Sequence, residues 1–383
     1  MNPVIQNLQI NSFRGLKGLN LSELGSVNIL VGKNNSGKTT ILEAISIACN
    51  PIDPFQWIGT SERRLNIGRS PIALRPSLES IKWLFPQENS DLKNRQYQGE
   101  IEINVTGNTA ISVIATISDI YGVGSEKADF IDEQDTSSDP ENVDTSQTEY
   151  ERSGVELEVL INEQADSKPD NFEPINQDNT FQFWEDERFV QRKKMRGKPL
   201  VNHVTVYPSY SSSDVMLALR LTQITKEGVK NDLLEVLRLF DPEILDIHIL
   251  TSAPRISNLY IEHQQLGFAP FYTFGDGLKK TLLIALALPL AKDGILLIDE
   301  IETSIHFSAL SQVFDWLIKA CKINNTQLFV TTHSLEAVDA MLDAESKKKE
   351  VVAFRLNSDG EAPQRFAGEF LQRLRFNRGL DVR

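Results

Sequence analysis

The segment GKNNSGKT, Gly32 to Thr39, constrains the fold of this chain more than any other feature. It lies between the apolar run VNILV and an apolar, helix-like stretch that reaches Cys49. A buried strand before the loop and a helix after it form the setting that the pattern GxxxxGK[ST] requires. The glycines allow backbone N–H groups to converge on phosphate oxygens at the N-terminus of the helix. The sequence therefore predicts an α/β fold built around a P-loop.

The P-loop predicts two ligands, ATP and Mg²⁺. Lys38 is placed to reach the β- and γ-phosphates, and the hydroxyl of Thr39 is placed to hold the metal. A glycine-rich turn before an ordinary helix is the alternative, and the agreement of both pattern and setting disfavours it. The residues of this segment that we expect at the nucleotide are Gly32, Asn34, Asn35, Ser36, Gly37, Lys38, Thr39 and Thr40.

Two later strands end in residues suited to phosphate chemistry. The run ILLIDE has the form of a Walker B strand, in which Asp299 holds the metal through water and Glu300 orients or deprotonates the attacking water. The run QLFVTTHS carries His333 at a strand end, where an imidazole can contact the γ-phosphate. A capped strand end and a structural histidine are the simpler explanations of each pattern alone. Together with the P-loop, the patterns predict Lys38, Glu300 and His333 as catalytic residues and Thr39 and Asp299 as metal ligands.

The rest of the chain predicts a mixed architecture. Residues 51–95 are rich in Pro and turn formers, and we expect short helices there, anchored by Trp57, Trp83, Leu84 and Phe85. Alternating residues on both sides of Gly107 predict a β-hairpin and an antiparallel layer. Residues 231–250 predict an amphipathic helical arm followed by a strand. Two apolar strands separated by a helix at 307–323 predict a parallel, right-handed βαβ core.

The acidity of the chain is local. The net charge is −14, but residues 125–187 hold twenty Asp or Glu against three Lys or Arg, which leaves +3 for the other 320 residues. Residues 122–154 have few apolar side chains, so we expect most of this stretch to be a loosely held insertion. DNA mimicry by the acidic segment is an alternative. A basic cluster follows at 188–198, which predicts a solvated face, a partner for the acidic segment, or a DNA contact.

The composition is that of a globular protein with a sizeable core, with 40% apolar and 24% charged residues. The sequence has no run of eighteen apolar residues and no signal-peptide pattern, so we expect a cytoplasmic protein without a membrane partner. Cys49 and Cys321 are expected to be reduced core residues. We expect an N-terminal lobe at 1–121, the acidic insertion at 122–187 and a C-terminal lobe at 188–383.

Five segments in a fixed order carry a family resemblance: SFRGLKGL, GKNNSGKTT, GDGLKKTLLIALAL, LLIDEIETSIH and VTTHS. In this order they resemble the ABC-type ATPases of the SMC, RecF and OLD (overcoming lysogenisation defect) group. The chain looks most like the stand-alone OLD-like members, often catalogued as AAA-family ATPases, which work beside a separate TOPRIM nuclease in anti-phage systems. The resemblance covers almost the whole chain except the acidic insertion. It implies a P-loop NTPase with an ABC-ATPase head, in which a mixed sheet is joined to an antiparallel β layer and a helical arm.

The resemblance implies that two chains close on two nucleotides, as a homodimer or a higher even homo-oligomer. In such ATPases a signature loop meets the γ-phosphate of ATP bound to the opposite subunit, and GDGLKK stands at that place. Gly275 and Gly277 would contribute backbone N–H groups, and Lys279 or Lys280 a positive charge. Gly275 replaces the usual signature serine, which predicts weaker activation of the partner site or a different geometry. A glycine cap before a core helix is the alternative.

Further residues take their expected roles from the resemblance alone. Arg14 matches the arginine that such ATPases bring to the phosphates, with an ordinary surface arginine as the alternative. Glu302 and His306 fall in the D-loop region along the dimer seam, and Gln56 is a Q-loop candidate by position.

The predicted function is ATP hydrolysis coupled to dimerisation, in the sensor or regulatory ATPase of an anti-phage system. The chain continues only about fifty residues beyond VTTHS, so we expect a TOPRIM-type nuclease to be a separate effector. Two alternatives remain: a RecF-like DNA-repair ATPase that binds DNA, and a nucleotide-gated scaffold with slow hydrolysis. A subunit of an ABC transporter is disfavoured because those proteins lack the long inserted segment.

Overall fold

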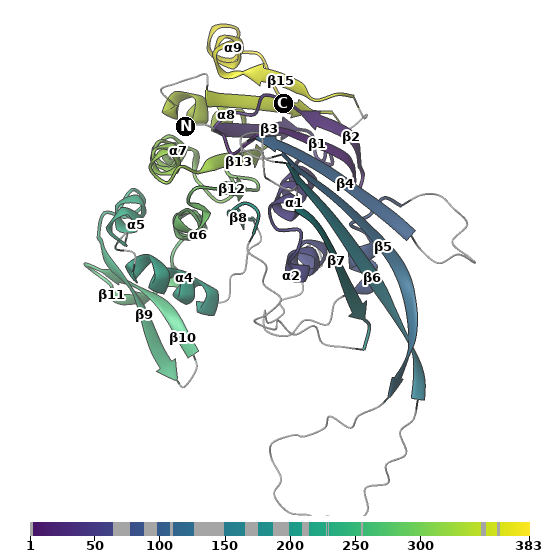
Figure 1. Ribbon diagram of the computed structural model, residues 1–383. Coiled ribbons are helices and arrows are strands. Elements are labelled where there is room, and N and C mark those ends of the chain that lie inside the picture. Colours follow the sequence, from purple (N-terminus) through teal and green to yellow (C-terminus); the bar gives the residue numbers. More distant parts are fainter. Residues whose placement is uncertain are drawn as a thin grey trace, which may run out of the picture.

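The described part of the chain contains two six-stranded sheets and one three-stranded sheet (Figure 1). The computed structural model describes residues 3–63, 77–87, 98–107, 110–125, 149–164, 175–186, 199–208, 214–226, 228, 230–253, 256–345, 350–357 and 361–383. The basic cluster at 188–198 and the centre of the predicted acidic insertion, 126–148, lie outside these residues.

The central sheet has the strand order β15-β14-β3-β13-β12-β8 and is parallel except for β15. Its core strands read as unbroken apolar runs because helices cover both faces. The strands are β3 (Val27–Gly32), β8 (His203–Val206), β12 (Ile295–Ile298), β13 (Gln327–Thr332), β14 (Val351–Leu356) and β15 (Gln364–Ala367). The parallel pairing of β12 and β13 across the helix at 307–323 confirms the predicted parallel core.

The second sheet is antiparallel, in the order β2-β1-β4-β5-β6-β7. Its strands are β1 (Ile5–Phe13), β2 (Leu16–Leu21), β4 (Gln98–Gly107), β5 (Ala110–Ser125), β6 (Glu149–Gln164) and β7 (Ile175–Trp184). The pairing of β4 with β5 confirms the predicted hairpin. Buried and exposed residues alternate along β4, as expected when one face of a strand lies on the core.

Strands β5 and β6 form a long ribbon at the far end of this sheet. Their pairing is continuous from Ala110 opposite Gln164 to Ser125 opposite Glu149. Pairing with β4 ends at Ser118, and pairing with β7 ends at Gly154, so the ribbon continues beyond both neighbours with two strands. Figure 1 shows this ribbon extending away from the body of the molecule.

The ribbon corrects part of the sequence analysis. Residues 122–125 and 149–154 were expected in a loosely held insertion, but they are ordered strand residues. Residues 175–184, which also fall in the predicted acidic insertion 122–187, form β7. The division of the chain into lobes at 121 and 187 remains a prediction, although the boundary at 121 cuts through β5.

Helix α1 (Lys38–Cys49) lies between the two large sheets, and its apolar residues pack with those of the antiparallel sheet and one face of the parallel sheet. The other face of the parallel sheet is covered by α6 (Asp276–Ala287), α7 (Phe307–Ile323), α8 (Leu335–Ala344) and α9 (Gly368–Gln372). Short helices α2 (Pro54–Glu62) and α3 (Leu78–Lys82) confirm the prediction for 51–95. Trp57, Leu84 and Phe85 are buried anchors, but Trp83 is 55% exposed and is not one.

A small third sheet beside α6 contains β9 (Ile244–Ala253), β10 (Ile256–His263) and β11 (Gly267–Pro270). Helices α4 (Asp214–Lys226) and α5 (Lys230–Leu237) pack with it, and α5 followed by β9 confirms the predicted arm and strand. Cys49 and Cys321 are buried free thiols whose pKa values are raised by burial, as expected for reduced core residues. None of the helices in the described ranges has the length and apolar character needed to cross a bilayer.

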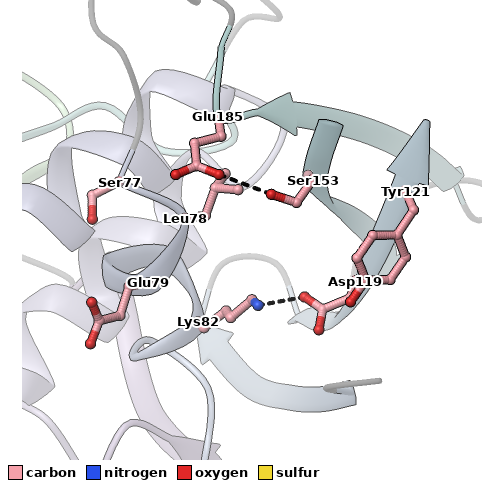
Figure 2. A pocket seen from close by; sticks show the side chains of 9 residues that line it. Ser77, Leu78, Glu79, Lys82, Asp119, Tyr121, Ser153 and Glu185 are labelled. Atoms are coloured by element: carbon pink, nitrogen blue, oxygen red, sulfur yellow. Dashed lines mark hydrogen bonds and ion pairs between the residues drawn. The ribbon is translucent and has the colours of Figure 1, made fainter. Parts of the chain in front are cut away.

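Helix α3 is attached to the antiparallel sheet around a polar cavity of about 380 Å³ (Figure 2). The Lys82 ammonium lies 2.5 Å from the Asp119 carboxylate of β5. On the opposite wall the Ser153 hydroxyl of β6 donates a hydrogen bond of 2.9 Å to Glu185. The Lys82–Asp119 ion pair attaches α3 to β5, close to where the two-stranded ribbon begins.

Candidate nucleotide-binding site

The P-loop joins the buried strand β3 to α1 through a tight, left-handed turn. Asn35 has a φ of 62° and Gly37, directly before α1, has a φ of 90°. A Cβ atom at Gly37 would lie 2.6 Å from Cδ2 of Leu16, so a side chain is excluded by contact as well as by conformation. The loop therefore holds the N-terminus of α1 open toward a ligand, as the motif predicts.

Lys38 is turned back onto the loop. Its ammonium donates hydrogen bonds of 2.8 Å to the carbonyl oxygens of both Gly32 and Lys33. Burial lowers the pKa of the Lys38 amine, and the nearby carboxylates, first Asp299, oppose this effect. Phosphate oxygens would give this buried charge partners of full negative charge in place of neutral carbonyls.

The predicted metal ligands are in direct contact. The Thr39 hydroxyl donates to both Asp299 carboxylate oxygens, at 3.0 and 3.1 Å. The Thr331 hydroxyl donates a 2.6 Å hydrogen bond to Oδ1 of Asp299 and accepts one of 2.8 Å from the Glu300 N–H. A hydroxyl and a carboxylate that converge in this way supply the oxygen ligands that Mg²⁺ prefers, so the residues fit this ion.

Thr331 is a functional residue that the sequence analysis missed. It is fully buried and touches both Walker B carboxylate residues. In the sequence it reads as one of two β-branched residues at the end of an apolar strand, which is the usual composition of a strand. Its place next to Asp299 follows from the parallel pairing of β12 with β13.

Glu300 occupies a conformation that few residues adopt. Its φ is 45°, in the left-handed region, and its Oε2 accepts a 3.2 Å hydrogen bond from the Thr303 hydroxyl. Left-handed conformations of residues other than glycine cluster at functional sites. The turn after β12 thus holds Glu300 at the rim of the cavity described next.

A cavity of about 660 Å³ brings the predicted site residues together. Its volume is within the range of small-molecule sites. One wall is the turn between β1 and β2, and another is the segment that follows β14. The predicted residues that line it are Arg14, Asn34, Asn35, Ser36, Gly37, Lys38, Thr39, Thr40, Asp299, Glu300 and His333. Thr331, which was not predicted, lines it as well.

The main chain of His333 is held from both sides. Its N–H donates a 2.7 Å hydrogen bond to Glu302, and its carbonyl accepts one of 2.9 Å from the Arg383 guanidinium. Val382, next to this arginine, is buried. The imidazole of His333 lines the cavity while its backbone is fixed, which is the arrangement that a γ-phosphate sensor needs.

The family is shown by a match over most of the chain. The family described as "AAA domain, putative AbiEii toxin, Type IV TA system", AAA_21, matches residues 27–339, from the strand before the P-loop to beyond His333. The chain belongs to the AAA_21 family. This membership and the geometry confirm the predicted α/β P-loop fold and the predicted ATPase class.

Relatives of this AAA_21 protein include an "ATP/GTP phosphatase" of Helicobacter pylori (strain ATCC 700392 / 26695). The two are 25% identical over 392 residues, covering 96% of this chain and 97% of the relative. An uncharacterized protein of Methanocaldococcus jannaschii is 36% identical over 112 residues, 28% of this chain and 98% of that protein.

Two solved structures are similar over nearly the whole chain. One is an SMC head bound to the C-winged helix domain of ScpA, with a TM-score of 0.47, 13% identity, and coverage of 97% of this chain and 100% of that one. The other is an Smc head with an extended coiled coil bound to the C-terminal domain of ScpA from Pyrococcus furiosus. Its TM-score is 0.45, its identity 11%, and it covers 97% of this chain and 98% of that one.

The Arg14 guanidinium of this AAA_21 chain is bound by groups of α1 and α2. It pairs at 2.8 Å with the fully buried Glu43 of α1 and donates to the carbonyl of Thr60 in α2. Glu43 pairs with Arg63 as well, at 3.0 Å. Arg14 lines the cavity, and its predicted phosphate contact remains a prediction.

The two glycines of the signature loop, Gly275 and Gly277, have different surroundings. Gly275 precedes α6, is exposed, and has open space where a Cβ would lie. A Cβ at Gly277 would lie 2.8 Å from the Ser304 carbonyl oxygen, so this glycine lets α6 pack against the D-loop region of its own chain. Gly277 thus has a packing role in addition to the predicted contact with a second nucleotide.

Lys280 is directed into the core of its own chain, toward the end of β12. It is 4% exposed, its ammonium donates a 3.2 Å hydrogen bond to the carbonyl of Asp299, and burial lowers its pKa to about 8. The expected contact of Lys280 with a partner's nucleotide remains a prediction. Lys279 lies on the outer side of α6 and pairs with Asp276 at 3.1 Å.

Gln56 and His306 are not among the residues that line the cavity in the described part of the chain. The Gln56 amide donates a 2.6 Å hydrogen bond to Ser46. His306 is the residue before α7, where its Nδ1 contacts the Ser308 hydroxyl at 2.8 Å.

Proposed function

We propose that this AAA_21 chain hydrolyses ATP with Mg²⁺ and that two copies close on two nucleotides. The observation that carries the proposal is the hydrogen-bonded set Thr39, Asp299 and Thr331, with Lys38 and Glu300 beside it on one cavity. These residues come from α1, β12 and β13, so the meeting of strand ends creates the site.

The residues have complementary parts in phosphoryl transfer. Lys38 leaves the loop carbonyls and pairs with phosphate oxygens, which offsets the charge that develops on them. Thr39 and Asp299 hold Mg²⁺, which when bound neutralises charge on the β- and γ-phosphates. Glu300 accepts a proton from water as the water oxygen bonds to the γ-phosphorus and the bond to the bridging oxygen of ADP breaks. The His333 imidazole contacts the γ-phosphate.

Dimerisation is supported by the form of the signature loop. Gly275 is exposed at the start of α6, and no side chain in the described ranges caps this helix. The first N–H groups of a helix are suited to bind an anion. A γ-phosphate held by a second copy would satisfy them.

The biological role that we propose is control of a separate effector, a TOPRIM-type nuclease, in defence against phage. The family description names a toxin and a type IV toxin–antitoxin system, which supports a toxin- or defence-related role. The Helicobacter relative is named for both ATP and GTP, so GTP belongs in every assay. The alternative role, DNA binding as in RecF-like ATPases, would depend on the basic cluster at 188–198.

A nucleotide-gated scaffold is the second candidate. The observation that favours it is Gly275, because a glycine there lacks the hydroxyl that a serine would offer to the γ-phosphate. A scaffold would bind ATP and assemble while turning it over slowly.

The test compares the wild type with Glu300→Gln, each with and without nucleotide and Mg²⁺, by phosphate release and by light scattering. Glu235→Gln, an exposed glutamate on α5, is the matched control. We expect Glu300→Gln to stop hydrolysis and to form a stable dimer or larger species only with nucleotide. Absence of hydrolysis by the wild type would refute the ATPase proposal, and unchanged mass in all conditions would refute nucleotide-driven assembly.

A further inference from the structure

Lys280 is a charged residue at the start of the buried part of α6. Residues 281–287 of α6 are all buried, and Lys280 itself is only 4% exposed. A buried ammonium is unfavourable unless nearby groups compensate its charge. Chains keep such a residue where its contacts serve a purpose that a leucine or methionine cannot serve.

The contact of Lys280 is with the main chain of the Walker B turn. Its ammonium donates to the Asp299 carbonyl at 3.2 Å, and the carboxylates of Asp299, Glu300 and Glu302 stabilise its charge. Among the described residues that line the nucleotide cavity, Asp299 and Glu300 are present and Lys280 is not. Lys280 therefore lies behind the site, where it touches the catalytic turn and not the nucleotide.

The peptide group between Asp299 and Glu300 is held at both ends. Lys280 binds its carbonyl oxygen, and the Thr331 hydroxyl binds its N–H at 2.8 Å. The peptide leads directly into the left-handed conformation of Glu300, with φ of 45°. Such a conformation persists only where surrounding contacts impose it, and these two hydrogen bonds fix the peptide that defines it.

We propose that Lys280 is a positioning residue for Glu300, holding the Asp299–Glu300 peptide so that the Glu300 carboxylate is aimed at the attacking water. Because Lys280 is on the helix that begins at the signature loop, the position of α6 sets the direction of the base within the same chain. The inference rests on the proposed ATP hydrolysis and adds a form of regulation of that site. A contact at the signature loop that moves α6 changes the orientation of Glu300 through Lys280.

The central experiment is Lys280→Met, which keeps the length of the side chain and removes the ammonium. Lys319→Met is the matched control, since Lys319 is 67% exposed on α7 and pairs with Asp315. We expect kcat for ATP to fall at least tenfold while KM changes less than twofold, because misaimed groups slow the chemical step and leave substrate binding intact. Removal of one partner from a buried set of charges destabilises a protein, so the rates are compared well below the thermal midpoint of each variant.

A double-mutant cycle separates positioning from general structural damage. Glu300→Gln, Lys280→Met and the double variant are compared in long single-turnover incubations with enzyme in excess, which measure the residual hydrolysis that remains after steady-state turnover has stopped. If Lys280 acts through Glu300, the double variant should be no slower than Glu300→Gln alone. Lys280→Arg retains a cationic donor, and we expect it to recover part of the kcat that Lys280→Met loses; it serves in the cycle if Lys280→Met does not fold.

Three results would overturn the inference. They are an unchanged kcat in Lys280→Met, a raised KM at constant kcat, and an equal further loss in the Glu300→Gln background. Each of these results leaves the proposed function unaffected as long as the wild type hydrolyses ATP. A wild type without hydrolysis refutes the proposed function itself, so the two failures are distinguishable.

Discussion

Replacement of Thr331 by valine tests whether one hydroxyl organises the Walker B carboxylates. The two side chains have nearly the same shape, and Thr331 is fully buried, so the change removes hydrogen bonds without opening a cavity. The hydroxyl donates to Asp299 at 2.6 Å and accepts the Glu300 N–H at 2.8 Å. Valine can do neither.

The expected cost follows from these two contacts. A hydrogen bond to a charged group contributes about 1.5–3 kcal/mol, and a buried N–H left without a partner costs about 1–3 kcal/mol. The additional buried methyl group offsets about 0.8 kcal/mol. We therefore expect the free energy of unfolding of Thr331→Val to fall by about 3 kcal/mol. We expect ATP turnover to fall at least tenfold, because Asp299 and Glu300 lose their shared anchor.

Thr326→Val is the control, because Thr326 is equally buried and its hydroxyl bonds only to main-chain carbonyls, at 3.1 Å to Ala291 and 3.3 Å to Asn324. Its loss should cost about 1 kcal/mol and leave turnover unchanged. Urea unfolding followed by circular dichroism gives the stabilities, and phosphate release gives the rates. The reasoning is refuted if Thr331→Val is no less stable than Thr326→Val and hydrolyses ATP like the wild type.

Three further substitutions test separate features. Gly37→Ala forces a side chain onto a φ of 90° and into contact with a leucine, so ATP affinity measured by calorimetry should fall at least tenfold. Gly275→Ser meets open space and adds both a cap for α6 and the usual signature hydroxyl; phosphate release should rise severalfold, and an unchanged rate would contradict the signature role. Glu43→Gln removes a buried carboxylate shared by two arginines, which should lower the free energy of unfolding by about 3–5 kcal/mol in urea. A loss below about 1 kcal/mol would show that this pair adds little.

The residues that the sequence places correctly are those at strand and loop ends. Lys38, Thr39, Asp299, Glu300 and His333 all line one cavity. Each follows a strand of the same parallel sheet, and the carboxyl ends of such strands meet at one edge. Prediction of the strands was therefore sufficient to predict that these side chains lie close together.

The contacts that the sequence does not predict depend on packing between distant segments. Lys280 is on a helix that is buried almost all round, so periodicity could not tell which side faces β12. Arg14 finds its carboxylate, Glu43, on another element, and no local pattern links the two. Thr331 acquires its role only through the register of β13 against β12.

The extent of the strands at 149–164 and 175–184 was underestimated from the sequence for a different reason. Val155, Leu157, Val159 and Ile161 alternate with polar residues and are buried, and this part was recognised. Their flanks are acidic or polar and look like loop in isolation. Pairing with the long partner β5 makes them strands, because the register continues past the apolar core.

The two-stranded end of β5 and β6 is mechanically connected to the nucleotide cavity through the antiparallel sheet. Beyond β4 and β7 it continues for five residues per strand, or about 17 Å. The same sheet runs strand by strand to β1 and β2, whose turn carries Arg14 and lines the cavity. A load on the ribbon therefore acts on the cavity wall through continuous backbone hydrogen bonds.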